Sequence, residues 1–270
     1  MGGAVLLGGE YISKQIIANS HNNLYRGELL YDATTSTAGH FASIQELQVA
    51  VDLGDFSDIY IGDYIITWDP TTGHVSTTQW LVAGINVLSC YAMTGTTSSD
   101  GGTYRPHLAL IPRQCFHYPY KMHSSNNNKS GYYNTSLNKT DLPALGANLR
   151  ESGYFENALH YALHMMSKSG NSSGATGSNW YGTYLILPSE VSLFSTALRQ
   201  NQFDTLNNLQ FQLPLFRLRP DLIFDVSRGY WLSTIPKTGN TVFCNIKTEG
   251  DVTSTTATTE SGLRPIAIFV

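Results

Sequence analysis

The chain has 270 residues, of which only 13% are charged, and its formal net charge is −4. Soluble domains ordinarily carry about 25% charged residues, and here Ser, Thr, Asn, Gly and Tyr are abundant instead. There is no cluster of Lys and Arg to neutralise phosphates, and no apolar stretch reaches the ~18 residues of a membrane span. We therefore expect no nucleic-acid partner and no membrane insertion. The composition suits a binding surface rich in adaptable hydrogen bonds, or simply a neutral extracellular or virion protein.

The cysteines Cys90, Cys115 and Cys244 lie far apart, and none belongs to a Cys-x-x-Cys pair. We interpret all three as buried thiols, because disulfide scaffolds and zinc fingers need denser or paired spacings. The apolar run at residues 1–9 lacks a preceding positive charge and is too short for a signal-peptide core. These features predict synthesis in a reducing cytoplasm.

Residues 1–45 begin with a Gly-rich apolar run and show no sustained period. They are predicted to be an arm for oligomerisation or virion attachment, ahead of a main domain at residues 46–270. The alternative is that they form the first strand and loop of that domain. A helix is predicted from Ser43, which can cap it with Glu46 at the capping-box position. Ile44, Leu47 and Val51 then share one face.

The rest of the chain alternates between short strands and loops, with two further helices. Strands are predicted, from their β-branched and aromatic residues, at residues 59–66, 78–85, 107–112, 183–187, 230–232, 241–246 and 263–270. Loops are predicted at 124–139 and 167–179, a long helix at 148–166, a short helix at 188–194 capped near Ser189, and an irregular segment after 213–216. This order indicates an α+β fold with long loops.

Motifs for catalysis or metal binding are weak. His160 and His164 share one face of the predicted helix, but Tyr161 stands where a zinc protease needs Glu. The triple Asn126–Asn128 has too few carboxylates nearby for calcium. No nucleophile-elbow, phosphate-loop or dinucleotide motif occurs in a suitable context. We expect no catalytic residues, no metal and no cofactor, although catalytic groups can also meet from distant positions.

A set of short motifs, in order, resembles an uncharacterised domain family common in phages and Firmicutes. The motifs are residues 59–64, 80–85, 107–112, 131–136, 187–190, 214–216, 230–232 and 262–265. The closing pattern, from Tyr230-Trp231-Leu232 to Arg264-Pro265, also resembles the C-type-lectin-like, formylglycine-generating-enzyme-like proteins. The resemblance covers residues 44–270. It implies a C-type-lectin-like fold, a bacteriophage virion protein and a role in host attachment.

Two departures narrow what the resemblance implies. The Glu-Pro-Asn and Trp-Asn-Asp motifs of calcium-dependent lectins are missing, which argues against calcium-dependent sugar binding. The cysteine pair with which a formylglycine-generating enzyme binds copper is also missing, which argues against oxidase activity. Some proteins of the resembled group are diversified by retroelements that mutate adenines. Such mutagenesis mainly varies AAC and AAT codons. Those codons can come to encode the residue types found at Asn245, Asp251 and Thr253, among others, but not those at Lys247 and Glu249.

Residues 248–261 contain eight Ser or Thr in fourteen positions, between two apolar strands. Anchored ends with a polar middle favour a binding loop, although a solvated hairpin without a partner has the same pattern. Alternation along residues 241–251 extends the predicted face into the preceding strand. The predicted ligand-binding residues are Ser233, Thr234, Asn245, Lys247, Glu249, Asp251, Thr253, Ser254, Thr256, Thr258 and Thr259.

Three functions follow from these observations. The first is a non-enzymatic display protein on the virion surface, which forms a homotrimer. Its expected partners are a host cell-surface protein or glycan and, on the particle, other virion proteins. The second is a structural head-decoration or head-fibre protein, and the third is a lectin-fold enzyme. Trp231 and Arg264 are interpreted as scaffold residues, with Arg264 pairing with Asp225.

Overall fold

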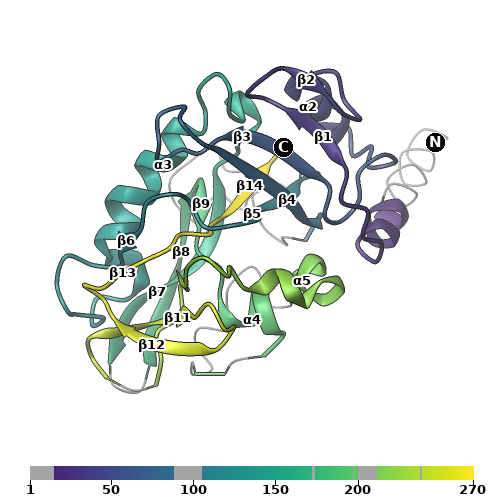
Figure 1. Cartoon of the computed structure of the whole chain (residues 1–270). Coiled ribbons are helices and arrows are strands. Elements are labelled where there is room, and N and C mark those ends of the chain that lie inside the picture. Colours follow the sequence, from purple (N-terminus) through teal and green to yellow (C-terminus); the bar gives the residue numbers. More distant parts are fainter. Residues whose placement is uncertain (1–14, 88–104, 172–173, 197, 200–211, 238) are drawn as a thin grey trace, which may run out of the picture.

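The computed structural model describes residues 15–87, 105–171, 174–196, 198–199, 212–237 and 239–270 (Figure 1). Seven strands form the main sheet in the order β2–β1–β3–β4–β5–β14–β9. These are β1 (Leu29–Asp32), β2 (Thr37–Ala38), β3 (Tyr64–Trp68), β4 (Thr77–Ile85), β5 (Leu108–Pro112), β9 (Leu185–Ile186) and β14 (Ile266–Phe269). Only the β1–β3 pair is parallel in this sheet. The prediction of an α+β fold is confirmed.

Smaller sheets and short helices complete the domain. A three-stranded sheet joins β10 (Tyr230–Trp231), β11 (Val242–Ile246) and β12 (Val252–Thr256), and β13 (Glu260–Ser261) pairs with β6 (Tyr120–Lys121). Helices among the described residues include a segment at 15–21, α2 (Ile44–Asp52), α3 (Leu142–Asn148), α4 (Glu190–Phe194) and α5 (Pro214–Leu218), with the short helical turns η2 (Tyr132–Asn134), η3 (Leu137–Asp141), η4 (Glu156–Ala158) and η6 (Pro220–Ile223). Figure 1 places the three-stranded sheet below the main sheet, with α3 along one side.

Local capping signals located two helices correctly. In α2 the Ser43 side chain accepts from the Glu46 N–H at 3.0 Å, and Ile44, Leu47 and Val51 are buried as predicted. The Glu46 carboxylate accepts from the N–H of Ala42 rather than Ser43. In α4, Ser189 caps the first turn reciprocally with Ser192.

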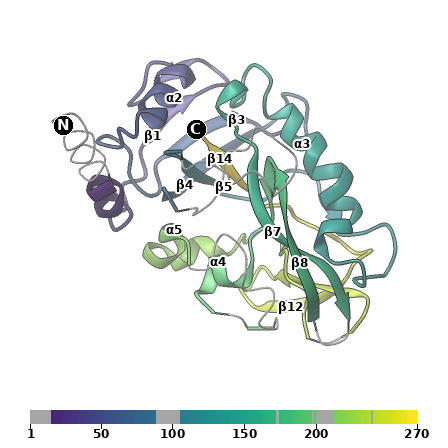
Figure 2. The same cartoon turned by 180° about the vertical axis from the view of Figure 1, so that it is seen from behind.

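The helix predicted at residues 148–166 is wrong. The helix α3 ends at Asn148, Gly153 adopts a left-handed φ of 84°, and a long hairpin of β7 (Ala162–Asn171) and β8 (Gly174–Thr183) follows. Figure 2 shows this hairpin reaching from the main sheet toward β12. Leu149, Phe155 and Leu159 are buried, but Leu149 ends α3 whereas Phe155 and Leu159 flank η4. The predicted loop at 167–179 therefore lies largely in strands.

Other predicted boundaries shift because pairing partners, not local sequence, set them. The segment 59–66 becomes a strand only from Tyr64, the loop at 124–139 contains η2 and the start of η3, and the segment after Leu213 forms α5. Cys244 is buried as predicted, Cys115 is only half-buried, and Cys90 lies outside the described residues.

The predicted boundary at residue 45 is not seen in the described part of the N-terminal segment, because residues 15–45 belong to the main domain. β1 lies inside the main sheet, and Ala18 and Leu30 are fully buried. The Asn22 amide exchanges two hydrogen bonds with the backbone of Ile85, at 2.8 and 2.9 Å. Residues 1–14, the first part of the predicted arm, lie outside the described residues.

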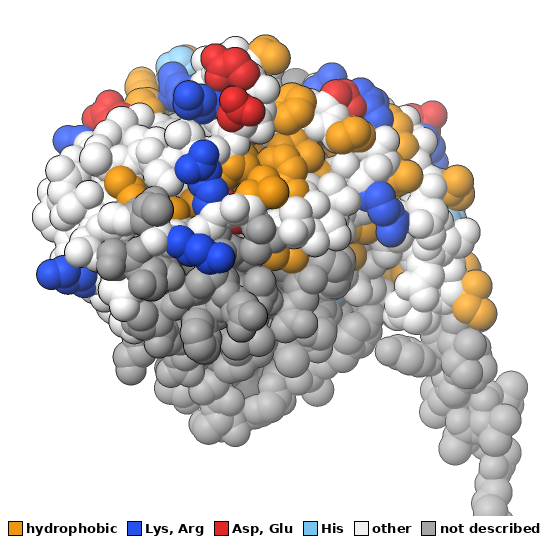
Figure 3. Space-filling model, turned by 90° about the horizontal axis from the view of Figure 1, so that it is seen from below, with side chains coloured by type: hydrophobic (Ala, Val, Ile, Leu, Met, Phe, Trp, Pro, Cys, Tyr) orange, Lys and Arg blue, Asp and Glu red, His pale blue; other side chains and the backbone are white. Residues whose placement is uncertain are grey.

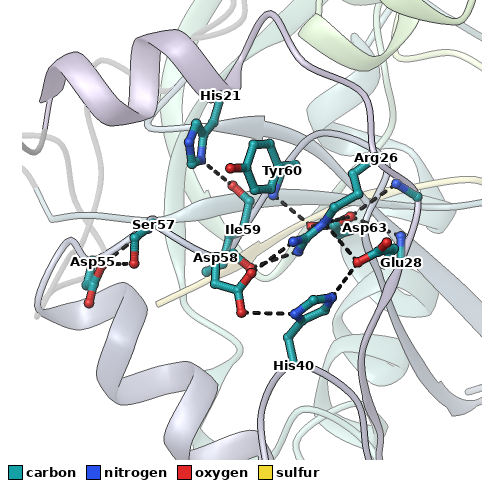
Figure 4. Close-up of polar contacts among 11 residues, drawn as sticks. His21, Arg26, Glu28, His40, Asp55, Ser57, Asp58, Ile59, Tyr60 and Asp63 are labelled. Atoms are coloured by element: carbon teal, nitrogen blue, oxygen red, sulfur yellow. Dashed lines mark hydrogen bonds and ion pairs between the residues drawn. The ribbon is translucent and has the colours of Figure 1, made fainter.

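A charged cluster holds this N-terminal segment against the turn before β3 (Figure 4). The Asp63 carboxylate is fully buried and accepts from the Arg26 guanidinium and from the N–H groups of Gly27, Glu28 and Tyr60. Arg26 also donates to Asp58 at 2.9 Å. The carboxylate thus accepts from five N–H groups, two of Arg26 and three of the backbone. Because its acceptors are satisfied, its burial costs little and fixes the backbone around it.

His40 connects the same cluster to the loop after β2. Its Nδ1 lies 2.9 Å from an Asp58 oxygen and its Nε2 lies 2.6 Å from a Glu28 oxygen. His40 therefore joins Asp58 to Glu28 through contacts at both of its ring nitrogens.

Arg264, immediately before β14, is a cation buried in the core. Its Nε donates to the Pro112 carbonyl at 2.7 Å, and one terminal nitrogen donates to the carbonyls of Leu222 and Ile223 at 2.6 and 3.1 Å. No ion pair with Asp225 forms between these described residues, so the predicted pairing is corrected. Asp225 instead accepts from the N–H groups of Cys115 and Ser227.

We predict that Arg264→Lys lowers the free energy of unfolding by about 2–4 kcal/mol, because one ammonium cannot reach all three carbonyls and leaves buried acceptors unpaired. Urea denaturation measures the change. Arg113→Lys, at an exposed site, is the control and should stay within about 0.5 kcal/mol. Equal effects for the two variants would contradict the anchoring role of Arg264.

A second prediction concerns acid stability and Asp58. Burial alone would raise its pKa, but hydrogen bonds and charge from Arg26 and His40 outweigh that effect and hold the pKa below 3.8. A folded-state pKa below the unfolded one stabilises the protein above pH ~4, and this contribution is lost as the pH falls through the folded value. Asp58→Asn should thus be less stable than the parent at pH 7, by under about 1 kcal/mol for an exposed pair.

Urea denaturation at pH 7 and at pH 3 tests this second prediction. The stability difference between Asp58→Asn and the parent should narrow at pH 3, where the carboxyl is becoming neutral in both states. An unchanged difference at the two pH values would contradict it.

Candidate functional site

The register of the three-stranded sheet decides which side chains of the predicted face lie together. Asn245 pairs with Trp231 on one side and with Thr253 on the other, and Phe243 pairs with Thr255. Directly paired residues project to the same side of a sheet. Thr253 and Thr255 therefore share a side with Asn245. By the same alternation, Ser254 and Thr256 project to the opposite side.

A hollow of about 440 Å³ opens beside Asn245, between the end of β11, the turn that follows it and β13. We call it the Asn245 hollow. It is lined by Arg228, Gly229, Asn245, Lys247, Thr248, Glu249, Thr255, Thr259, Glu260 and Ser261. The lining combines hydroxyls, one amide and charges of both signs.

Asn245 is 94% buried at the hollow, and its hydrogen bonds fix how its amide is turned. The Ser261 hydroxyl donates to the Gly229 carbonyl at 2.9 Å, so its lone pair accepts from Asn245 Nδ2. The opposite atom, Oδ1, accepts no hydrogen bond from the described residues, yet it is not sealed from solvent. It lies beside Gly229, which also lines the hollow. Asn245 Oδ1 is thus a fixed hydrogen-bond acceptor that has no donor among the described residues.

The rim of the hollow comes from the turn after β11 and from neighbouring segments. The Lys247 N–H donates to the Asp251 carbonyl, and Gly250 closes the turn at a φ of 91° that favours glycine. Among the described residues, no ion pair joins Arg228, Lys247, Glu249 and Glu260 to one another. These charges therefore remain able to contact a ligand.

The structure brings together four of the predicted ligand-binding residues: Asn245, Lys247, Glu249 and Thr259 line the hollow. Asp251 is exposed beside it, and Thr253 lies on the same side of the sheet. The remaining predicted residues do not lie on this face. Ser254 and Thr256 project to the other side of β12.

Ser233 and Thr234 are not part of an exposed face either, since both are buried. The Ser233 N–H and hydroxyl donate to the Pro188 carbonyl, and Thr234 accepts from the Glu190 N–H, so they pack against the start of α4. Thr258 donates to Asn126 Oδ1 at 2.7 Å. That bond links the predicted face to the Asn-rich loop.

Several lining residues were missed from the sequence: Arg228, Gly229, Thr248, Thr255, Glu260 and Ser261. Thr255 could have been found by continuing the alternation from Thr253. Arg228 and Gly229 come from the segment just before β10, and only the folded sheet brings them to Asn245.

The other chemical candidates do not assemble as predicted. His164 lies in a strand and is buried, which lowers its pKa to about 3, so the shared helical face with His160 is wrong. Among the described residues, no three His, Cys, Asp or Glu side chains come together to hold a metal.

Cys115 lines a separate polar cavity of about 500 Å³ with Asp69 and His117. Burial, with the charge of Asp225, raises the pKa of its thiol well above its usual value. A nucleophilic cysteine needs the opposite shift.

Figure 3 views the molecule from the side on which β12 lies in Figure 1. On the coloured part of this face, Lys and Arg side chains stand around a patch of hydrophobic side chains.

Comparison with protein-family models, with curated proteins and with solved structures gave no match. Within the described ranges, none of the helices has the length and apolar character needed to cross a bilayer.

Proposed function

We propose that the protein is a non-enzymatic surface protein of a bacteriophage particle that binds a host cell-surface protein or glycan in the Asn245 hollow. The free acceptor at Asn245 Oδ1 carries this proposal. A fixed, mostly buried acceptor at an open hollow is matched by a ligand that brings an N–H or O–H donor. The amide is already held by Ser261, so little ordering cost remains on binding.

The rim fits a polar ligand better than an apolar one. Thr255 and Thr259 can donate or accept, and Lys247 and Glu249 offer both signs of charge within one turn. Polar groups of this kind fix orientation and specificity in binding sites. Their placement on strand ends and a tight turn gives the site a rigid base.

The virion setting, with synthesis in the cytoplasm of a bacterial host, follows from the motif resemblance, which also implies the C-type-lectin-like fold. In support, Trp231, Leu232 and Arg264, which belong to the closing motifs, are fully buried and act as scaffold. The low content of charged residues, with abundant Ser, Asn, Gly and Tyr, also suits a binding surface.

A cell-binding assay tests the proposal. The rim variant Lys247→Ala/Glu249→Ala/Thr259→Ala should keep its fold, because exposed changes cost less than about 0.5 kcal/mol each. Its binding to a panel of bacterial cells and printed bacterial glycans should fall by about tenfold or more, which corresponds to 1.4 kcal/mol. The parent protein must bind at least one member of the panel.

The variant Ser254→Ala is the matched control, because Ser254 lies on the same sheet but projects to the other side. The Ser254 hydroxyl is buried and has no hydrogen-bond partner among the described residues, so its loss should not destabilise the chain. Binding by the control should equal that of the parent. A folded rim variant that binds as well as the parent would place the binding face elsewhere.

We also propose a homotrimer, which suits a virion protein. The described N-terminal segment carries Ile16 and Leu24, which are 62% and 49% exposed and could pack against a second copy. Light scattering of the full chain should give about three times 29.7 kDa. Ile16→Glu should shift the mass toward one chain, and a monomeric parent would exclude the trimer.

A further inference from the structure

The polar cavity beside Cys115, which we call the Cys115 cavity, is a neighbour of the Asn245 hollow. Cys115 and His117 line the cavity, whereas Arg228 lines the hollow. The Cys115 thiol donates to the Arg228 carbonyl at 3.7 Å, and the Arg228 guanidinium donates to the His117 carbonyl at 3.0 Å. Arg228 therefore stands between the two sites and contacts residues of both.

The two sites together are large enough for a ligand of several linked units. The Cys115 cavity has a volume of about 500 Å³, and the Asn245 hollow has one of about 440 Å³. A pocket of roughly 300–1,000 Å³ holds a drug-sized ligand. Arg228 is only half-buried, so a ligand that occupies both sites can also contact it.

Arg113 and Gln79 bring hydrogen-bond donors to the Cys115 cavity, which both residues line. The Arg113 N–H donates to the Gln79 carbonyl at 2.8 Å, and the Arg113 guanidinium donates to Gln79 Oε1 at 3.3 Å. A guanidinium only donates, so this contact fixes which end of the amide faces Arg113. Gln79 Nε2 and the other guanidinium nitrogens of Arg113 have no acceptor in the described part of the chain.

The carboxylates near the Cys115 cavity already have donors of their own. Asp69, the acidic residue of the lining, is 97% buried and accepts four hydrogen bonds from neighbouring residues. Asp221 also feels the charge of Arg113, but it is paired with Arg219 at 2.6 Å. Among the described residues, Arg113 forms no ion pair. A cation with unused donors in a polar cavity favours an anionic group.

The Asn245 hollow suits a neutral part of the same ligand. Its lining includes Glu249 and Glu260 as well as Lys247, so the hollow does not favour an anion. Asn245 Oδ1 needs a donor, which a sugar hydroxyl supplies. The Thr259 hydroxyl can donate to or accept from a second sugar hydroxyl. The two sites thus match an anionic group and a hydroxylated group of one chain.

The chemistry of the two linings favours a glycan over a protein segment. Among the described residues that line either site, there is no large apolar side chain. Protein interfaces are usually centred on such side chains, above all Trp and Tyr. Hydroxyl and amide side chains match the many hydroxyl groups of a sugar chain instead.

We propose that the host ligand is an acidic glycan chain that occupies both sites. Its carboxylate or phosphate group lies in the Cys115 cavity and accepts from the Arg113 guanidinium and from Gln79 Nε2. A neighbouring sugar residue lies in the Asn245 hollow and donates a hydroxyl to Asn245 Oδ1. This inference rests on the proposed function, because it takes the Asn245 hollow as part of the host-binding site.

Calorimetric titration of the full chain with three matched sugar tetramers tests the inference. They are a galacturonate tetramer, a galactose tetramer phosphorylated at its 6-hydroxyls, and the unmodified galactose tetramer. Saturable binding of at least one anionic tetramer is expected, and which one binds distinguishes a carboxylate from a phosphate. The neutral tetramer should bind about tenfold more weakly, because it lacks the charge-assisted hydrogen bonds. Added salt should weaken only the anionic tetramer.

Two variants separate the two sites. Arg113→Gln should weaken the anionic tetramer by about tenfold and leave the neutral one unchanged. The rim variant of the Asn245 hollow should weaken both tetramers alike, because it keeps the net charge of the hollow. Arg150→Gln removes an exposed arginine that lines neither site. It is the matched control and should bind as the parent does.

The inference is overturned if the folded parent binds neither anionic tetramer, or binds the neutral tetramer equally well. It is also overturned if Arg113→Gln binds the anionic tetramer as tightly as the parent, or if the parent binds a host protein but no tetramer. Loss of cell binding in the rim variant, with cell and tetramer binding unchanged in Arg113→Gln, would leave the proposed function standing without this inference. Unchanged cell binding in the rim variant would remove the proposed function itself.

Discussion

Burial of the Arg264 guanidinium is the constraint on which the two halves of the domain depend. Removing a cation from water is expensive unless its donors are satisfied. Here Nε donates to the last carbonyl of β5 and one terminal nitrogen donates to two carbonyls of η6, while the other terminal nitrogen is buried without a hydrogen-bond partner among the described residues. The Phe216 and Tyr230 rings lie 5.6 Å from the guanidinium. One side chain thus fixes the main sheet, η6 and the start of the three-stranded sheet relative to one another.

The position of the Asn245 hollow depends on these contacts of Arg264. The Tyr230 hydroxyl donates to the Ile223 carbonyl, which Arg264 also contacts, so β10 is held at the same point. β10 then sets the register of β11 by pairing Trp231 with Asn245. The free acceptor of Asn245 is consequently fixed by a chain of core contacts, although its ligand would come from solvent.

Features determined by near neighbours could be predicted from the sequence. The Ser43 and Ser189 caps located two helices, and short apolar runs located β4, β5 and β14. The helix expected at 148–166 failed because its apolar spacing also suits residues buried by several short elements. Within the site, alternation found Asn245 but could not show that pairing with Trp231 buries it, or that Arg228 and Glu260 join it. Those facts depend on contacts between distant segments.

The place of β14 in the main sheet has a consequence for how the chain acquires its structure. β14 lies between β5 and β9, and Arg264 contacts a residue 152 positions earlier. Closing so long a loop costs entropy before any contact compensates for it, and such topologies fold slowly. Until β14 arrives, the apolar strand β5 presents an unpaired edge, which favours association with other chains. Folding at low protein concentration should therefore give higher yields than folding at high concentration.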